Sequence, residues 1–391
     1  MLTTGIVLFL TGSSALVLAT IGVPFVAWGF SWFRGPRPVP LSNARSQSLE
    51  ILVPAHNEEA VIAATLTSLV RAAEKLKAHL GAETPQVLIR VGMDHCSDRT
   101  ADEIEKLAHN SSVSIQAIEN PGAAGKWNVL RLLIGAASAD WVALVDSGSV
   151  WDENLLVAAW PTISASDTVG LAPSYLPKKA GLLEKLNWGL EHFLKDIENH
   201  SGGPVSVHGA SVLYRNECLQ VAMRELGSFG WLNDDVVIPL TLRSFFPGLK
   251  LVYLRGGNAG AWVSDIGLVS EVSVEMGRRR RMVVGNLQWI ANLFVKSGSR
   301  NVQVALVASR RVFRLLWAYW ALMIATGSVF SILGALELKD AVLALGALAA
   351  LFAAVFLGSN WVRRVSAALL SGLAVPSLLR DARTLDGIKW V

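Results

Sequence analysis

Long uncharged segments at both ends of this 391-residue chain limit the folds open to it. Residues 1–33 contain no charged side chain, and two further uncharged apolar runs cover 315–336 and 341–362. Each run is long enough to cross a bilayer as a helix, which takes roughly 20 residues. Only residues 337–340 separate the last two runs, which predicts a tight hairpin. We therefore expect one N-terminal transmembrane anchor, rather than a cleaved signal peptide, and two C-terminal spans.

The composition agrees with a chain that is part membrane protein and part soluble domain. Charged residues make up only 17% of the chain, against about 25% in a typical soluble domain. Polar residues concentrate between the apolar ends, which predicts a soluble domain over 34–300 and a membrane hairpin with an amphipathic tail over 301–391. The net charge of +4 is too mild to indicate nucleic-acid binding.

Clusters of arginine predict the orientation of the chain. They follow the first expected span, precede the second and follow the third. Loops rich in Lys and Arg stay in the cytoplasm. We therefore expect a multi-pass protein of a membrane such as the bacterial inner membrane, with its soluble domain in the cytoplasm and its N-terminus outside.

Short apolar runs alternate with segments of helical periodicity in the first half of the soluble domain. The runs that predict strands cover 49–54, 86–92, 113–118 and 141–145. The segments that predict helices cover 58–79, 98–109 and 125–137. This alternation is typical of an α/β fold with a parallel sheet and helices on both faces. Ligands of such sheets bind outside the carboxyl ends of the strands.

Acidic residues follow three of the expected strands. Glu58, Asp94 and Asp146 stand at these strand ends, and Lys126 precedes the fourth strand. Each of these alone is explained by ordinary turn chemistry, but together they indicate a ligand site. The first strand is not followed by a glycine-rich dinucleotide fingerprint, and the chain lacks a GxxxxGK[ST] loop, which argues against nicotinamide enzymes and P-loop nucleotidases.

An ordered series of motifs resembles the membrane-anchored family 2 glycosyltransferases. The matching segments cover roughly residues 49–285, and they are ILVPAHNEE (51–59), VGMDHCSDRTADE (91–103), GKWN (125–128), WVALVDSGSVWDENLL (141–156), HGASVLYR (208–215) and WLNDDVVIPLTLR (231–243). The resemblance implies a GT-A fold, a nucleotide-sugar donor, an inverting mechanism and a divalent cation, Mg²⁺ or Mn²⁺.

The resemblance also implies roles for single residues. Asp235 matches the general base, and Asp146 matches the first Asp of the DxD motif, which approaches the diphosphate and the metal. The other residues implied to bind the donor are Pro54, Asn57, Glu58, Asp94 and Lys126, and those implied on the acceptor side are Gly209, Ala210, Ser211 and Asp234. The chemistry agrees, because an attacking sugar hydroxyl needs a carboxylate to take its proton and the leaving diphosphate needs cations.

Two departures from the family pattern bear on mechanism. Gly148 replaces the second Asp of DxD, so a carboxylate bridge to metal is half missing. The stretch matching the QxxRW motif of processive members reads Arg278 to Met282, without its Gln and Trp. Arg278 and Arg281 are expected either to neutralise the diphosphate or to contact lipid headgroups. The lost Trp argues against processive polymerisation.

Amphipathic helices are expected near 182–200 and 278–297. In the second, with Trp289, the membrane interface is favoured over core packing, whereas the first, with Trp188, fits either. A site at the bilayer suits a lipid or lipid-linked glycan acceptor. The sequence thus predicts a hexosyltransferase that uses a UDP-sugar in glycolipid or exopolysaccharide synthesis. The alternatives are a processive synthase, acting with partner subunits or as an oligomer, and a catalytically dead scaffold.

Overall fold

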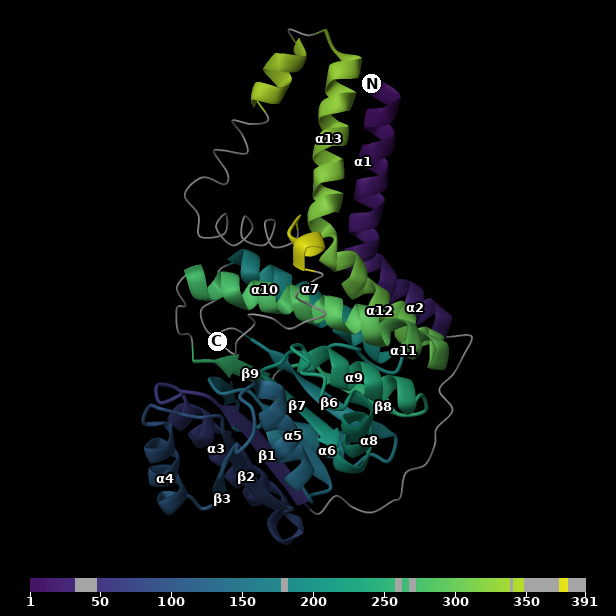
Figure 1. The fold of residues 1–391 in the computed structure, drawn as a ribbon. Coiled ribbons are helices and arrows are strands. Elements are labelled where there is room, and N and C mark those ends of the chain that lie inside the picture. The colour runs from purple at the N-terminus through teal and green to yellow at the C-terminus, as the bar shows by residue number, and fades with distance from the viewer. Residues whose placement is uncertain are drawn as a thin grey trace.

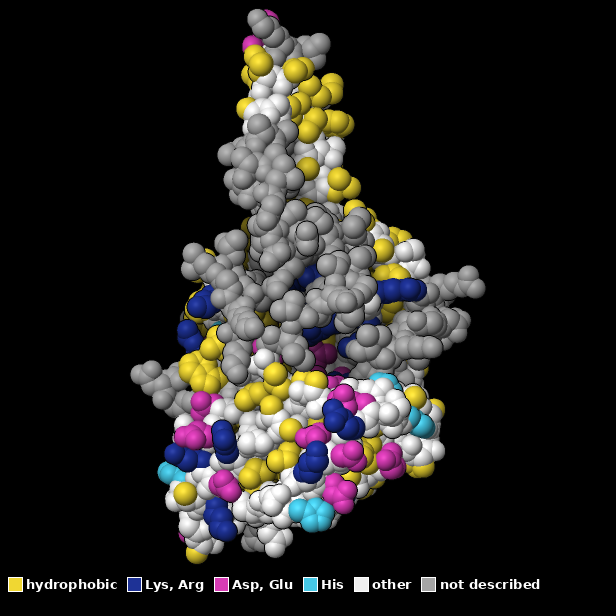
Figure 2. All heavy atoms as spheres, turned by 90° about the vertical axis from the view of Figure 1, so that its left-hand side faces the viewer, with side chains coloured by type: hydrophobic (Ala, Val, Ile, Leu, Met, Phe, Trp, Pro, Cys, Tyr) yellow, Lys and Arg dark blue, Asp and Glu magenta, His cyan; other side chains and the backbone are white. Residues whose placement is uncertain are grey.

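The computed structural model describes residues 1–31, 48–176, 182–256, 262–266, 272–337, 340–347 and 373–378. An α/β domain forms one end of the molecule, and two long helices project from it as a stalk (Figure 1). Helices that lie across the base of the stalk separate these two parts (Figure 1). Hydrophobic side chains dominate the visible stalk, whereas charged side chains of both signs cover the visible face of the α/β domain (Figure 2).

The first half of the domain has the predicted order of strands and helices. The parallel strands are β1 (Ser48–Ala55), β2 (Gln86–Met93), β3 (Ser114–Glu119) and β4 (Trp141–Val145), in the order β3-β2-β1-β4. The helices between them are α3 (Ile62–Leu80), α4 (Thr100–Asn110) and α5 (Lys126–Ala136). Side chains of β1 alternate between two cores: Leu52 packs on the α5 face, and Ile51 and Val53 pack on the α3 face. A strand buried on both faces is therefore apolar throughout.

The second half turns the sheet into a mixed one, where the sequence had predicted a parallel sheet. Antiparallel pairing joins β4 to β7, β7 to β6 and β9 to β5, while β8 and β9 run parallel to β6. These strands are β5 (Ser149–Trp151), β6 (Thr168–Tyr175), β7 (Ser211–Arg215), β8 (Lys250–Leu254) and β9 (Trp262–Asp265). The helices of this half are α6 (Leu155–Ile163), α8 (Asn216–Leu226) and α9 (Asp234–Phe245).

The stalk consists of two apolar helical segments, Leu2–Phe30 and Trp317–Ala335, that are long enough to cross a membrane. The first comprises α1 (Leu2–Val17), a π-helical turn (Leu18–Gly22) and most of α2 (Val23–Ser31), and the second is α13. Only 17% and 11% of their most apolar windows are buried inside the protein, unlike the core helices of a soluble fold. The described residues thus contain two such helices instead of the three predicted. Of the third expected span, 341–362, only 341–347 are described, as helix.

Small residues let the two stalk helices approach closely. A Cβ on Gly327 would lie 2.5 Å from the backbone nitrogen of Phe9, and a Cβ on Gly5 would lie 2.5 Å from that of Ser331. Gly12 and Gly334 leave equally little room. Close backbone approach through small residues is a common way for membrane helices to associate.

The base of the stalk is built from α7 (Leu182–Asn199), α10 (Val272–Trp289), a π-helical turn (Ile290–Phe294), α11 (Val295–Arg300) and α12 (Val302–Leu315). The helices predicted near 182–200 and 278–297 are therefore present. On α7, Leu186, Leu190 and Phe193 are exposed apolar side chains. Trp289 was expected at the membrane interface, but it is fully buried in the main core.

Arg310 of α12 ties the stalk to the base through a buried ionic network. Its guanidinium lies 3.1 Å from Glu191 and 3.3 Å from Glu198. Its Nε donates to the carbonyl of Thr20, in the π-helical turn of the stalk. Arg314 adds a second contact to Glu191, at 2.7 Å. Burial alone would raise the pKa of Glu191, but Arg314 and Arg310 hold it down at about 2.

Candidate active site

Lys126 stands at the centre of a cluster of carboxylates at the end of the sheet. Its Nζ lies 2.6 Å from Asp146 Oδ1 and 3.1 Å from Asp234 Oδ1. Asp146 directly follows β4, Asp234 opens α9, and Lys126 opens α5. Burial opposes a charged Lys126, but the two carboxylates raise its pKa and keep it an ammonium. The fold thus brings together three predicted site residues from separate segments of the chain.

Asp235 lies beside this cluster on the side of the stalk. Its Oδ2 is 3.7 Å from a guanidinium nitrogen of Arg311, and its backbone carbonyl accepts from the Val207 amide at 2.9 Å. Burial raises the pKa of Asp235, and Arg311 partly counteracts this. A Cβ on Gly209 would lie 3.5 Å from Asp146 Oδ2 and 3.8 Å from Asp235 Cβ, so this glycine keeps the space between the two acids open.

The residues predicted to bind the donor lie around the end of β1. The Pro54 carbonyl accepts a hydrogen bond from Ser147. Asn57 adopts a left-handed φ of 55°, and its side chain accepts from the Ser97 amide. Glu58 is half-buried; burial, followed by the charges of Asp146 and Asp98, raises its pKa to about 7. Its proximity to Asp146 places Glu58 at the edge of the carboxylate cluster.

Asp94 is fully buried, and its carboxylate organises two loops. Its Oδ1 accepts from the Asn120 amide group and its Oδ2 accepts from the Gly125 backbone, each at 2.7 Å. The second bond holds the turn that leads into Lys126. Asp94, which the family resemblance implies to bind the donor, thus anchors the segment that carries Lys126.

Helix α10 carries the predicted arginines over the cluster. Arg281 is close enough to Asp146, Asp234 and Asp235 for their charges to act on its pKa, which burial nevertheless lowers. Arg278 is exposed, and its charge contributes, together with burial, to lowering the pKa of His208. The helix is held in place by Asn233, which donates to the Met282 carbonyl and contacts Asn286.

Asn233 stands at the N-cap position of α9, but its side chain makes no capping hydrogen bond. Gly285 permits this arrangement, since a Cβ there would overlap the Asn233 side-chain amide. The Asn233 side chain therefore packs against α10 instead of capping α9.

An aromatic group lies on the predicted acceptor side. The rings of Tyr175 and His208 stack at 3.7 Å between centroids, and Trp188 of α7 lies 5.2 Å from His208. Burial, followed by the charges of Lys195 and Arg278, lowers the pKa of His208 to about 3, so this imidazole is neutral. The sequence analysis gave no role in the site to Tyr175, nor to Arg311 beyond a basic flank.

Ala210 and Ser211 support the site from behind. The Ala210 carbonyl accepts from the Asp146 amide at 3.1 Å. The Ser211 hydroxyl accepts from the Trp151 indole at 3.0 Å and is buried, so it points into the core. Both side chains are buried, and the Ala210 backbone helps to shape the loop around Asp146.

The residues present fit a divalent cation that is shared with a bound diphosphate. Among the described residues, no three His, Cys, Asp or Glu side chains gather into a metal site. Gly148, at the position of the missing carboxylate, has a left-handed φ of 84°. Of the two acidic positions of the DxD motif, only Asp146 carries a carboxylate in this chain. Mg²⁺ is commonly held by one or two carboxylates together with substrate phosphates.

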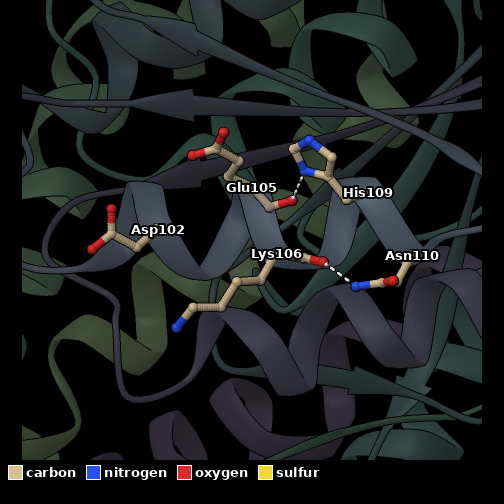
Figure 3. Close-up of a pocket in the computed structure, with 5 residues that line it drawn as sticks. All are labelled: Asp102, Glu105, Lys106, His109 and Asn110. Atoms are coloured by element: carbon tan, nitrogen blue, oxygen red, sulfur yellow. Dashed lines mark hydrogen bonds between the residues drawn. The ribbon is translucent and has the colours of Figure 1, made fainter.

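A separate polar hollow lies on α4, away from this cluster (Figure 3). It is lined by Asp102, Glu105, Lys106, His109 and Asn110. His109 and Asn110 donate to carbonyls one turn earlier in the same helix. These are ordinary contacts of an exposed helix face, so we give the hollow no role.

A mixed α/β sheet with a carboxylate cluster at its strand ends defines this protein as a GT-A-like glycosyltransferase. The model of the family described as "Glycosyltransferase like family 2" matches residues 46–258, more than half of the chain. The chain therefore belongs to this family. A search of curated proteins found no match.

A solved mannosyltransferase structure shares the fold of this chain at low sequence identity. The mannosyltransferase PcManGT from Pyrobaculum calidifontis, in complex with GDP-Man and Mn²⁺, is 15% identical with a TM-score of 0.67, over 95% of this chain and 99% of that one. Glucosyl-3-phosphoglycerate synthase from Mycobacterium tuberculosis, in complex with Mn²⁺ and UDP-Glc, is 13% identical with a TM-score of 0.40, over 64% and 83%. The first match extends over the stalk as well as the α/β domain.

Proposed function

We propose that this protein is a membrane-bound inverting glycosyltransferase that moves a hexose from a nucleotide-sugar, a UDP-sugar, to a lipid or lipid-linked glycan at the cytoplasmic face. One observation carries the proposal: Asp146, Lys126 and Asp234 meet at the strand ends, and Asp235, next to Asp234, contacts Arg311 of α12 at the base of the stalk. This arrangement places charge for a leaving diphosphate beside a carboxylate for proton transfer.

The donor's diphosphate is proposed to bind at Asp146, Lys126 and Arg281. Asp146 would hold a divalent cation together with the diphosphate, and this cation would supply positive charge to the leaving group. Lys126 and Arg281 add fixed positive charge on the same side. The backbone around Gly125, held by Asp94, keeps Lys126 in place.

Asp235 is proposed as the general base. The acceptor hydroxyl gives its proton to the Asp235 carboxylate while its oxygen attacks the anomeric carbon of the donor sugar. The bond from that carbon to the diphosphate breaks on the opposite face, and the diphosphate leaves with the electron pair. Burial raises the pKa of Asp235, which makes its carboxylate a better proton acceptor.

The membrane assignment rests on the exposed apolar surface of the stalk. Its helices are long, apolar and largely unburied. Exposed apolar side chains of α7 continue this surface at the base. A site below such a surface is reached by an acceptor that lies in the membrane interface.

The direct test is turnover of purified protein in lipid nanodiscs. UDP- and GDP-linked hexoses are added together with a membrane lipid extract, and the released nucleoside diphosphate is measured. The mass of the lipid product is determined by mass spectrometry. We expect Asp235→Asn to lower turnover by about 10²- to 10⁴-fold while donor binding stays. Asp167→Asn, in an exposed pair with Lys250, is the matched control.

Full turnover in Asp235→Asn would remove the proposed base. A product with one added sugar supports the proposed reaction, whereas a long ladder of products supports a processive synthase. Absence of product with every donor, despite folded protein that binds nucleotide, would favour a scaffold.

A further inference from the structure

Arg311 holds an incompletely satisfied guanidinium beside the proposed base. Its closest ionic contact, to Asp235, is 3.7 Å long, which exceeds an ordinary hydrogen bond. Its other terminal nitrogen, Nη1, is buried and has no hydrogen-bond partner among the residues that the structure describes. A buried charged donor without an acceptor is unfavourable, so this guanidinium has the capacity to bind a further acceptor.

The neighbouring carboxylates are already used by other cations. Glu191 and Glu198 bind Arg310, and Glu191 also binds Arg314. Asp146 and Asp234 bind Lys126. Arg311 therefore has only the long contact to Asp235 among the described carboxylates.

The surroundings of Arg311 are basic. Lys195 of α7 is half-buried, and its ammonium donates to the Ser206 carbonyl. Besides burial, the charges of Lys195, Arg278 and Arg311 all lower the pKa of His208, so the three cations lie in the neighbourhood of this ring. Lys and Arg side chains are visible between the hydrophobic stalk and the α/β domain (Figure 2). An anion is the ligand that this space favours.

We infer that Arg311 binds a phosphate group of the acceptor, so that the acceptor is a phosphate-bearing amphiphile. The planar fork of a guanidinium binds phosphate oxygens in pairs. Arg311 lies on α12, which ends two residues before α13 of the stalk begins. A ligand that reaches Arg311 from the stalk keeps its apolar part along the membrane helices. This inference rests on the proposed function, because it names the acceptor of that reaction.

The donor diphosphate is a less suitable partner for Arg311. Lys126 lies on Asp146 and Asp234, whereas Arg311 contacts Asp235. The base thus lies between the cation proposed for the donor and the cation proposed for the acceptor. Transfer of a sugar from one phosphate-bearing molecule to another requires this arrangement, with the base between the two phosphate-binding cations.

The inference is tested by binding of dodecyl phosphate to the full chain in dodecyl maltoside micelles. The dissociation constant is measured from tryptophan fluorescence for wild type, Arg311→Gln and Arg311→Lys. We expect Arg311→Gln to weaken binding about tenfold or more, and Arg311→Lys to restore part of it. Arg314→Gln, on the same helix but already paired with Glu191, is the matched control and should bind almost as wild type.

Three further measurements decide what the result means. Dodecyl glucoside, which has the same chain without phosphate, should show no dependence on Arg311. Inorganic phosphate should bind much more weakly than dodecyl phosphate; equal binding would overturn the assignment to an amphiphile. UDP and GDP should bind Arg311→Gln as they bind wild type, which also reports that the variant is folded.

Two outcomes overturn the inference. One is equal affinity of wild type and Arg311→Gln for dodecyl phosphate, and the other is an equal loss of nucleotide binding, which would place Arg311 in the donor site. Failure of the proposed function is distinguishable from both. Phosphate binding that depends on Arg311, in a protein that turns over no nucleotide-sugar, would leave the phosphate site standing and reject the transferase reaction.

Discussion

The ammonium of Lys126 lies 2.6 Å from Asp146 and 3.1 Å from Asp234, so one cation joins the acid that follows β4 to the acid that opens α9. The two carboxylates are 88 positions apart in sequence, at 146 and 234. Their approach brings the first turn of α9, with Asp235, to the proposed donor side. The geometry of the site therefore depends on this one amine.

Replacing Lys126 with Met should reduce turnover by about 10²- to 10³-fold, the cost of losing one preorganised charge at a leaving group. It also leaves two acids without their shared partner. Lys126→Arg should retain more activity, because it keeps the positive charge. Steady-state turnover, with thermal unfolding as a check of folding, measures both. Equal activity of the Met and Arg variants would contradict the role of the charge.

Restoring the missing carboxylate at Gly148 should tighten metal binding. A Cβ there would have Val61 as its nearest neighbour, at 3.9 Å, so there is space. The left-handed φ of 84° should cost Gly148→Asp about 1 kcal/mol of unfolding free energy. Titration of Mn²⁺ in the presence of UDP, followed by electron paramagnetic resonance, compares Gly148→Asp with wild type.

Gly148→Asn is the matched control for this experiment, because it has the same backbone strain without the negative charge. Only the Asp variant should bind Mn²⁺ more tightly than wild type. Removal of divalent cations by chelation should slow turnover in wild type and in Gly148→Asp alike. Turnover that is insensitive to chelation would reject the metal assignment.

Glu58 should make the folded protein less stable as the pH rises from about 4.5 to about 7. Its pKa is about 7 in the folded protein, against an ordinary value of 4.5. Across this interval the unfolded chain releases the proton while the folded protein retains it, so the free energy of unfolding falls with pH. Glu58→Gln cannot ionise and should remove this loss. Thermal unfolding should show a larger gain from Glu58→Gln at pH 7.5 than at pH 5; the same gain at both would contradict the assignment.

Gly327→Ala should destabilise the stalk. The added methyl group would lie 2.5 Å from the backbone of Phe9, so the two helices must separate. Overpacking of this kind costs about 1–3 kcal/mol. Gly29→Ala is the matched control, since a Cβ at Gly29 meets nothing within 4 Å. Unfolding in detergent is the measurement, and an equal response of both variants would argue against close packing at Gly327.

Local patterns were enough to predict the first half of the fold. Apolar runs such as 141–145 predicted parallel strands correctly, because a strand buried on both faces carries little besides apolar side chains. The short strands β5 and β9 have no such run, since Ser149 and Ser264 interrupt them, and their pairing depends on distant segments. The antiparallel pairings in the second half of the sheet could therefore not be predicted from the sequence.

The candidate site was predictable in its residue types but not in its contacts. Motifs identified Asp146, Lys126 and Asp235, and the fold brings these together. The pairing of Asp235 with Arg311 crosses 76 positions, from 235 to 311, and no local pattern encodes it. Likewise, Asn is a residue type that often caps helices, but the Asn233 side chain donates to the Met282 carbonyl of α10.

The position of Arg311 near the C-terminal end of α12 has a consequence for how the enzyme is made. Synthesis proceeds from the N-terminus, so a nascent chain acquires Asp146, Lys126, Asp234 and Asp235 before Arg311. The arginine emerges only a few residues ahead of α13, the helix that packs against α1. The proposed acceptor site is thus completed at about the time the stalk is assembled. An unfinished chain has the donor side and the base but lacks the residue proposed to hold the acceptor.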